Sequence, residues 1–124
     1  MPHPAEHKSA ARAINPSEAV ELAETLRALG SASRLQLLLS LIDHERTVEQ
    51  LAATIGLGQS ATSHHLRILR ALRLVHARKQ GRYVYYALHD HHVADLLAAV
   101  RHHHEHVYPP ATDQLQAALA EERA

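Results

Sequence analysis

The sequence predicts a mainly α-helical fold with one β-hairpin, and three observations lead to this prediction. Phe and Trp are absent and only four Tyr occur, so the apolar 46% of the 124 residues consists mostly of aliphatic side chains. Apolar residues recur at helical spacing along most of the chain, between breaks marked by glycine. One stretch around residue 80 instead carries β-rich runs on both sides of a basic, glycine-containing segment. The length suits one domain.

Two helices are predicted first. Ser17 is expected to cap a helix whose first turn carries Glu18 and Glu21 and which ends at Gly30. Ser31 or Ser33 is then expected to begin a second helix that runs to about residue 43. We expect its buried stripe to consist of Leu35, Leu38, Leu39 and Ile42.

A helix-turn-helix is predicted next. The segment Thr47-Val48-Glu49-Gln50 has the form of a capping box and would open a helix over 48–55 that Gly56 closes. A further helix is expected from Gln59 or Ser60 to about Leu72. The inward face of this helix is expected to carry Ala61, His65 or Leu66, Leu69 and Leu72. Its N-terminal half presents short polar side chains and an arginine, which suit a DNA major groove.

The β-hairpin follows this helix directly. Residues 74–77 and 83–88 are β-rich and flank a basic tip at 78–82. A helix-turn-helix followed by such a hairpin is a winged helix, whose wing contacts phosphates or the minor groove. The predicted DNA-contacting residues are Gln59, Ser60, Thr62, Ser63, His64 and Arg67 in the helix, and Arg78, Lys79 and Arg82 in the wing.

A final helix is expected from about Asp90 to Val107, and Tyr108-Pro109-Pro110 would end it. Its apolar stripe is predicted as Val93, Leu96, Leu97 and Val100. Residues 111–122 indicate either a short terminal helix or a disordered tail. We therefore predict a flexible segment over 1–16, one winged-helix domain over 17–107, and a tail or short helix over 108–124.

The zero net charge of the chain conceals an uneven distribution. Residues 51–89 contain six Lys or Arg and no Asp or Glu, whereas residues 1–50 carry a net charge of −2 and residues 90–124 a net charge of −4. A local positive field without carboxylates is what binding to a phosphate backbone requires. This pattern favours DNA as the partner over an ordinary solvated basic surface.

Seven of the 13 histidines lie between His89 and His106. His92 and His103 are eleven residues apart, which separates them by about 16.5 Å along a helix, too far for one metal ion with bonds of roughly 2.0–2.1 Å. His103 and His106 lie one turn apart on one face and can share an ion. If both ends of the helix contribute, two antiparallel helices must supply the ligands, which implies a homodimer with two symmetric sites.

Three motifs in the chain resemble the ArsR/SmtB family of bacterial metal-responsive repressors. They are Leu29-Gly30-Ser31-Ala32-Ser33-Arg34-Leu35, the run Gln59-Ser60-Ala61-Thr62-Ser63-His64-His65-Leu66-Arg67-Ile68-Leu69, and Leu88-His89-Asp90-His91-His92-Val93. The resemblance covers about residues 17–107. It implies a homodimer, joined through its first and final helices, that binds an inverted repeat in double-stranded operator DNA. Metal binding would then weaken the DNA complex and release transcription of metal efflux genes.

The resemblance also implies the metal ligands. The family's cysteine site is excluded because the chain has no cysteine. The family's other pattern, on the final helix, matches Asp90, His92, His103 and His106, which would form two inter-subunit sites per dimer. Three imidazoles and one carboxylate suit tetrahedral Zn(II), while Ni(II) and Co(II) readily accept six donors. Resemblance to the family's nickel/cobalt sensors, with His3 as an extra ligand, slightly favours Ni(II)/Co(II) over Zn(II).

Other classes of function are less consistent with the sequence. No glycine-rich phosphate loop or acid–base pair accompanies the histidines, so an enzyme is not expected. No apolar run is long enough to cross a membrane and no signal peptide is evident, so we expect a soluble, cytoplasmic protein. The alternative that stays open is a winged-helix regulator that responds to a signal other than metal.

Overall fold

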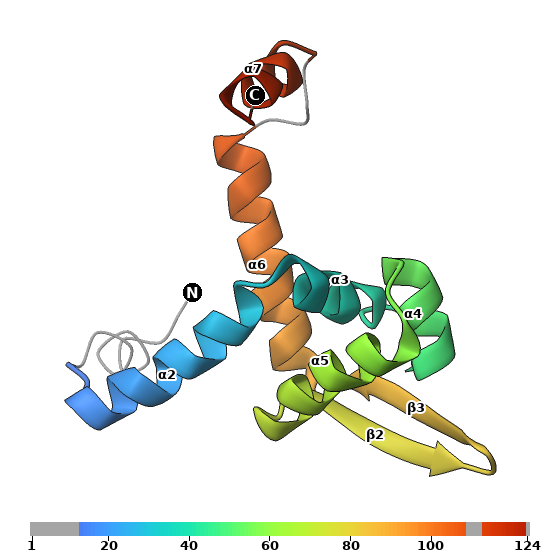
Figure 1. Ribbon diagram of the computed structural model, residues 1–124. Helices are drawn as coiled ribbons and strands as arrows, with labels where there is room; N and C mark the ends of the chain where they lie inside the picture. Colours follow the sequence, from blue (N-terminus) through green and yellow to red (C-terminus); the bar gives the residue numbers. More distant parts are fainter. Residues whose placement is uncertain (1–12, 109–112, 124) are drawn as a thin grey trace.

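The computed structural model describes residues 13–108 and 113–123. Figure 1 shows a mainly helical molecule with the strands grouped at one end. No helix among the described residues is both long and apolar enough to span a bilayer. The elements are α2 (Pro16–Leu29), α3 (Ala32–Ser40), β1 (Arg46–Thr47), α4 (Val48–Ile55), α5 (Gln59–Ala71), β2 (Val75–Gln80), β3 (Tyr83–Leu88), α6 (His91–Val107) and α7 (Asp113–Arg123).

The first two helices differ from the prediction at one end each. The N-cap of α2 is Asn15, whose side chain accepts a hydrogen bond from the Glu18 N–H, so the prediction of Ser17 as the cap is wrong. Pro16 occupies the first turn, where its missing N–H costs nothing. Ser31 caps α3 as expected, but the helix ends at Ser40 rather than near residue 43. In the C-terminal segment, the described residues form α7.

The helix-turn-helix is confirmed in detail. Thr47 and Gln50 form both hydrogen bonds of the capping box at the start of α4. Gly56 closes α4 with a φ of 72°, a left-handed conformation that glycine adopts without a Cβ penalty. The α5 helix then begins at Gln59, as one of the two predicted starts.

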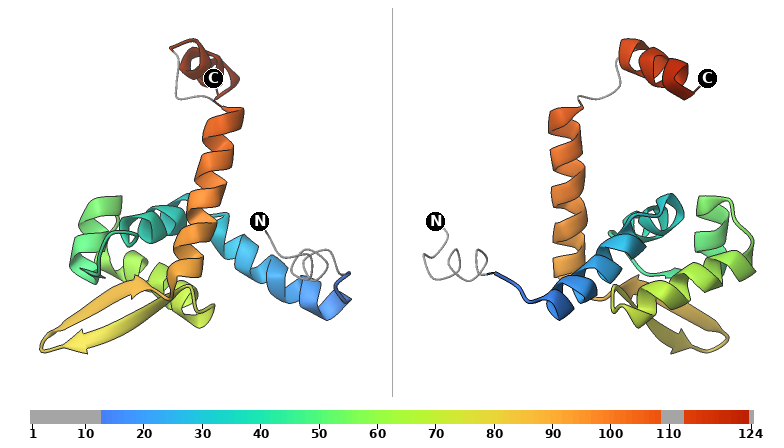
Figure 2. Two further views of the ribbon diagram at one scale, coloured as in Figure 1. Left: turned by 180° about the vertical axis from the view of Figure 1, so that it is seen from behind. Right: turned by 60° about the vertical axis from the view of Figure 1, so that its left-hand side comes forward.

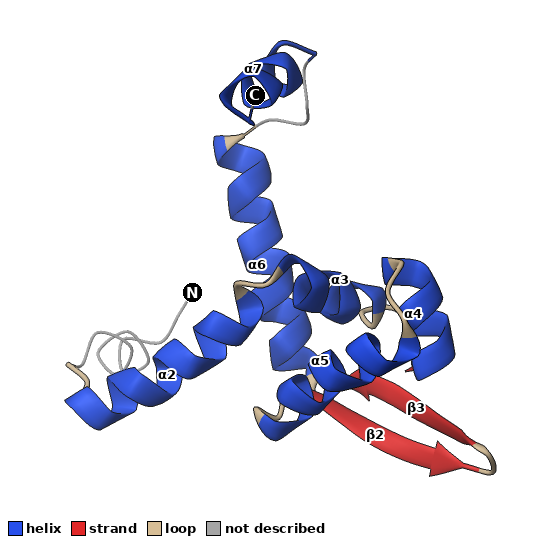
Figure 3. Ribbon diagram, viewed as in Figure 1, coloured by secondary structure: helices blue, strands red, loops and turns tan. Residues whose placement is uncertain are grey.

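The sheet has one strand more than predicted. The two-residue strand β1 pairs with β3, so the strand order is β1-β3-β2, as Figure 3 shows in part. In the hairpin, Gln80 pairs with Tyr83, so the loop consists of Gly81 and Arg82 alone. The prediction of a tip over 78–82 is therefore wrong, since Arg78 and Lys79 lie within β2.

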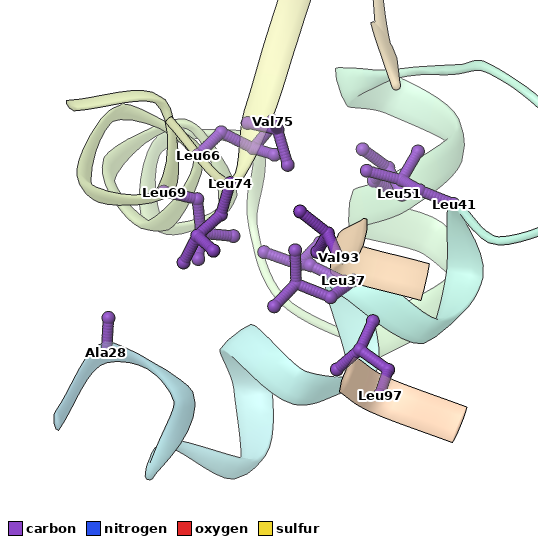
Figure 4. Close-up of a cluster of buried hydrophobic side chains, with 11 residues drawn as sticks. Ala28, Leu37, Leu41, Leu51, Leu66, Leu69, Leu74, Val75, Val93 and Leu97 are labelled. Carbon is purple, nitrogen blue, oxygen red and sulfur yellow. The ribbon is translucent and has the colours of Figure 1, made fainter. Parts of the chain in front are cut away.

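The core lies where α3, α4 and α5 meet the sheet and the first half of α6. Figure 4 shows Leu37 and Val93 near each other inside this cluster, with Leu66, Leu69 and Val75 on one side. Leu37 is fully buried, whereas Ile42 is 40% exposed. The predicted stripe of α3 therefore missed Leu37 and wrongly included Ile42, because the helix ends before Ile42.

The α6 helix belongs to the core only over its first half. Val93 and Leu97 are buried, while Val100 and Val107 are exposed. Figure 2 shows the second half of α6 extending beyond the lobe formed by α3, α4, α5 and the sheet, while α2 projects to one side. Large apolar side chains are also exposed on α2: Val20, Leu22 and Leu26. Between α2, α3 and α6 lies an apolar cleft of about 440 Å³.

Candidate functional site

The predicted DNA-contacting residues of α5 mostly lie on its outer surface. Gln59, Ser60, His64 and Arg67 are exposed and Ser63 is half-buried. Their spacing of three or four residues places them along one side of the helix. The N-terminal half of α5 therefore offers hydroxyl, amide, imidazole and guanidinium groups on one accessible face, which is the chemistry that reads base edges.

Thr62 is the exception in this group. Its side chain is fully buried and its hydroxyl donates to the Gly58 carbonyl at 2.9 Å. Thr62 therefore packs inside the helix-turn-helix, and its assignment as a DNA contact is wrong. The inward face also differs from the prediction at Ala61, which is exposed, while Leu66 rather than His65 is fully buried.

His65 instead contacts a residue that the sequence did not single out. The Nη1 atom of Arg34 lies 3.3 Å from His65 Nδ1, and Arg34 Nε donates to the Ala28 carbonyl at 2.8 Å. Burial lowers the pKa of the His65 imidazole, and the positive charge of Arg34 and then that of His64 lower it further. Arg34 thus joins the end of α2 to the helix that carries the predicted DNA contacts.

The three basic residues predicted for the wing have different surroundings. Lys79 and Arg82 are exposed, and no hydrogen bond or ion pair within residues 13–108 involves their side chains. Arg78 donates through Nε to Glu45 Oε2 at 3.0 Å and through Nη2 to Glu45 Oε1 at 3.3 Å. It also donates to Gln80 Oε1 at 2.6 Å. Two of the three wing cations are therefore free to meet phosphate.

The start of α6 brings the first two predicted metal ligands together. Asp90 is the N-cap, with extended backbone, and its Oδ1 accepts from the N–H groups of His92 and Val93. His92 Nδ1 lies 3.4 Å from Asp90 Oδ1. Desolvation opposes the shift, but the N–H groups of Val93 and His92 hold the pKa of the Asp90 carboxyl below its usual value. An ionised carboxylate and an exposed imidazole therefore lie side by side.

The other two predicted ligands lie at the far end of the same helix. His103 and His106 are exposed and one turn apart on α6. Among the residues that the structure describes, no three His, Asp or Glu side chains of one chain gather where an ion could bind them. The inter-subunit metal site therefore stays a prediction. His3 lies outside the described residues.

Residues 31–77 match the family model described as bacterial regulatory protein, arsR family. The HTH-type transcriptional regulator NmtR of Mycobacterium tuberculosis is 42% identical over 101 residues, which cover 82% of this chain and 84% of NmtR. A transcriptional repressor SmtB homolog of Synechocystis is also 42% identical, over 81% of this chain and 80% of that protein.

Solved structures agree with these sequence matches. The solution structure of apo-NmtR gives a TM-score of 0.66 at 41% identity, covering 83% of this chain and 87% of that one. A homodimeric winged helix-turn-helix DNA-binding domain from Mycobacterium bovis gives a TM-score of 0.69 at 31% identity, covering 82% of this chain and 97% of that domain. The predicted winged-helix fold is therefore confirmed.

Proposed function

Because this chain belongs to the ArsR/SmtB family of bacterial transcriptional regulators, we propose that it is a metal-responsive repressor. It binds operator DNA as a metal-free homodimer and leaves the DNA when Ni(II)/Co(II) or Zn(II) binds, which controls genes of metal efflux or homeostasis. The family consists of regulators, so the chain is not an enzyme. The observation that carries the proposal is the placement of Asp90 and His92 at one end of α6 and of His103 and His106 at the other.

The proposed DNA surface consists of α5 and the wing. Gln59, Ser60, Ser63, His64 and Arg67 would meet base edges and phosphates of the major groove, while Lys79 and Arg82 would bind the flanking backbone. Residues 17–107 form the DNA-binding and dimerisation domain. A regulator of operator DNA in a bacterium acts in the cytoplasm, and we place the protein there.

The homodimer follows from the uncovered apolar surface. Leu26 on α2 and Val100 on α6 are 62% and 56% exposed, respectively. Large apolar side chains on two neighbouring helices favour a partner that removes them from water. A second copy of the chain in two-fold symmetry would place the start of one α6 near the end of the other. The M. bovis domain of the same fold is homodimeric, which supports this arrangement.

The donor set fits a divalent transition ion. His92, His103 and His106 supply neutral imidazole nitrogens, and Asp90 supplies a carboxylate that is ionised over the physiological range. An ion bound there would hold the two protomers in one relative orientation. We favour Ni(II)/Co(II) slightly over Zn(II), with two inter-subunit sites per dimer and His3 as an additional ligand.

An ion at the proposed site would affect DNA binding through the relative orientation of the two α6 helices in the dimer. Val93 and Leu97 of α6 belong to the same core cluster as Leu66 and Leu69 of α5. A fixed orientation of two α6 helices would therefore fix the spacing of the two recognition helices. We infer that this spacing fits successive major grooves poorly. Such coupling is reciprocal, so DNA must weaken metal binding by the same factor. A competing proton on any ligating imidazole would also weaken metal binding.

A DNA-binding titration with two histidine variants tests the proposal. Fluorescence anisotropy on the DNA upstream of the gene should show tight binding by the metal-free protein and release when Ni(II), Co(II) or Zn(II) is added. His103→Ala should bind the DNA equally well but stay bound in metal. His102→Ala, one position away on α6, is the matched control and should respond like the wild type. Loss of DNA binding by His103→Ala alone would contradict the division of roles.

A second candidate function is a winged-helix regulator that responds to a signal other than metal. The apolar cleft between α2, α3 and α6 favours it, since its volume of about 440 Å³ is large enough for a small molecule. Leu26 and Val100 line this cleft, so such a molecule would bind at the proposed dimer interface. Equilibrium dialysis separates the two. About two tightly bound ions per dimer, lost in Asp90→Ala, support the metal sensor, whereas no bound ion supports the alternative.

A further inference from the structure

The guanidinium of Arg78 is held by three neighbours at once. Glu45 accepts two of its N–H groups, Gln80 accepts a third, and its Cζ lies 5.1 Å from the centre of the Tyr85 ring. A single exposed ion pair contributes little. A bidentate pair that is also stacked on an aromatic ring has a defined geometry, so less freedom remains to the side chain. Arg78 is therefore oriented towards Glu45.

The sheet register explains how these groups meet. Arg78 on β2 pairs with Tyr85 on β3, and Tyr85 pairs with Thr47 on β1. Paired residues share one face of an antiparallel sheet, and Glu45 lies two residues before Thr47. The side chain of Arg78 therefore crosses the Tyr85 ring to reach Glu45. This contact joins the outer strand of the wing to the segment between α3 and β1.

The neighbouring cation on the wing lacks such a contact. Lys79 follows Arg78 on β2, so the two side chains belong to opposite faces of the sheet. Within the described residues, no hydrogen bond or ion pair involves the Lys79 side chain. Free cations release counterions when they meet DNA phosphate, whereas a cation already neutralised by a carboxylate must first lose that partner. Of the wing cations, Arg78 is thus paired with Glu45, whereas Lys79 and Arg82 have no carboxylate partner among the described residues.

We propose that Glu45 withholds Arg78 from DNA phosphate and uses it to position the wing, so that Glu45 sets the strength and salt dependence of DNA binding. The inference rests on the proposed DNA-binding function. In it, Arg78 is a positioning residue, and the phosphate contacts of the wing come from Lys79 and Arg82. Replacing Glu45 by a neutral residue would convert Arg78 into an additional phosphate contact.

The test measures how DNA affinity varies with salt for single and double variants. The dissociation constant for a fluorescein-labelled duplex is determined over a range of KCl concentrations. Glu45→Gln should steepen the dependence of log K on log[KCl] by about 0.9 per wing, or about 1.8 per dimer. Arg78→Gln should change this slope little when Glu45 is present, but should remove the whole gain in the Glu45→Gln background. Lys79→Gln should reduce the slope in both backgrounds.

Two controls make the result decisive. Glu49→Gln removes a carboxylate from the exposed start of α4 and should leave the slope unchanged, which separates the local contact from net charge. If Arg78→Gln reduces the slope equally with and without Glu45, Arg78 binds phosphate and the inference is wrong. If the wild type does not bind the duplex at all, the proposed function fails instead.

A measurement without DNA tests the contact itself. In NMR spectra of the metal-free protein, the Nε–H of Arg78 should exchange with water more slowly than that of Arg82, and Glu45→Gln should abolish the difference. Equal exchange of the two arginines in the wild type would overturn the inference whatever the DNA titration shows.

Discussion

Arg34 Nη1 lies 3.3 Å from His65 Nδ1, and this contact links α3 to the helix that carries the proposed DNA contacts. A guanidinium only donates hydrogen bonds, so Nδ1 of His65 must accept and the ring must be neutral, with its proton on Nε2. The same arginine donates to the Ala28 carbonyl near the end of α2. Arg34 therefore links α2, α3 and α5, and its hydrogen bond to α5 requires a neutral His65 imidazole.

The first prediction is that acid weakens the fold through His65. Its pKa is lowered in the folded protein by burial, by Arg34 and by His64. The unfolded chain therefore binds the proton more readily, and the free energy of unfolding must decrease as pH falls through 6.5, the ordinary pKa of histidine, down to the lowered folded value. Below the pKa of His65 in the folded protein, His65 causes no further decrease in the free energy of unfolding. Urea denaturation at a series of pH values from 7.5 to about 5 measures it.

Two variants identify the responsible histidine. His65→Gln removes the titrating group and should flatten the dependence of the unfolding free energy on pH. His76→Gln alters an exposed histidine of β2 and should leave the dependence unchanged. An equally steep dependence in His65→Gln would show that another group is responsible.

The sequence was sufficient to predict features that arise from local hydrogen bonding. The capping box at Thr47 and Gln50 and the end of α4 at Gly56 were correctly predicted, because each depends on residues within one turn. The two-residue strand β1 was not predicted, because it forms only by pairing with Tyr85 and Tyr86, about forty positions away.

The same difference between local and long-range contacts applies to the candidate site. Helical spacing predicted that the outer face of α5 would be polar, but it did not show that Thr62 faces inward, because a threonine is compatible with either face. The sequence also did not indicate that Arg78 donates hydrogen bonds to Glu45, which lies 33 residues earlier. The charge pattern predicted a basic surface, while the state of each cation depends on the tertiary fold.

The second prediction separates Thr62 from its neighbour Ser63. Thr62→Val keeps the shape of a fully buried side chain but loses the hydrogen bond to Gly58, which should lower the unfolding free energy by about 1 kcal/mol. DNA affinity should stay unchanged well below the melting temperature. Ser63→Ala should show the opposite pattern, with weaker DNA binding and nearly unchanged stability. A loss of DNA affinity in a folded Thr62→Val protein would restore Thr62 as a DNA contact.

The third prediction concerns Arg73, which follows α5. Its φ of 57° is left-handed, a conformation that is unfavourable for residues with a Cβ atom. The Arg73 N–H donates to the Arg70 carbonyl and the Leu74 N–H to the Leu69 carbonyl, a C-terminal motif in which glycine is usual. Arg73→Gly should therefore raise the unfolding free energy by about 1 kcal/mol. Arg73→Ala removes the same charge without relieving the backbone, and equal stability of the two variants would contradict this explanation.

The last prediction tests whether two chains supply each metal site. One protomer carries Asp90→Ala and His92→Ala, and the other carries His103→Ala and His106→Ala. Each homodimer lacks half of the ligands at both sites and should not bind the ion tightly. In the heterodimer, purified through two different affinity tags, the intact start of one α6 meets the intact end of the other. It should therefore bind about one ion, against about two in the wild-type dimer.

A second heterodimer, in which the same four substitutions are distributed differently, provides the control. When all four substitutions are placed in one protomer and none in its partner, each inter-subunit site loses two ligands, so this heterodimer should bind no ion tightly. A site within one chain would give the opposite results, with no ion in the first heterodimer and about one in the second. The separation of about 16.5 Å between His92 and His103 along α6 is the physical reason to expect the first outcome. Isothermal titration with Ni(II), Co(II) and Zn(II) on both heterodimers counts the sites and compares the three metals.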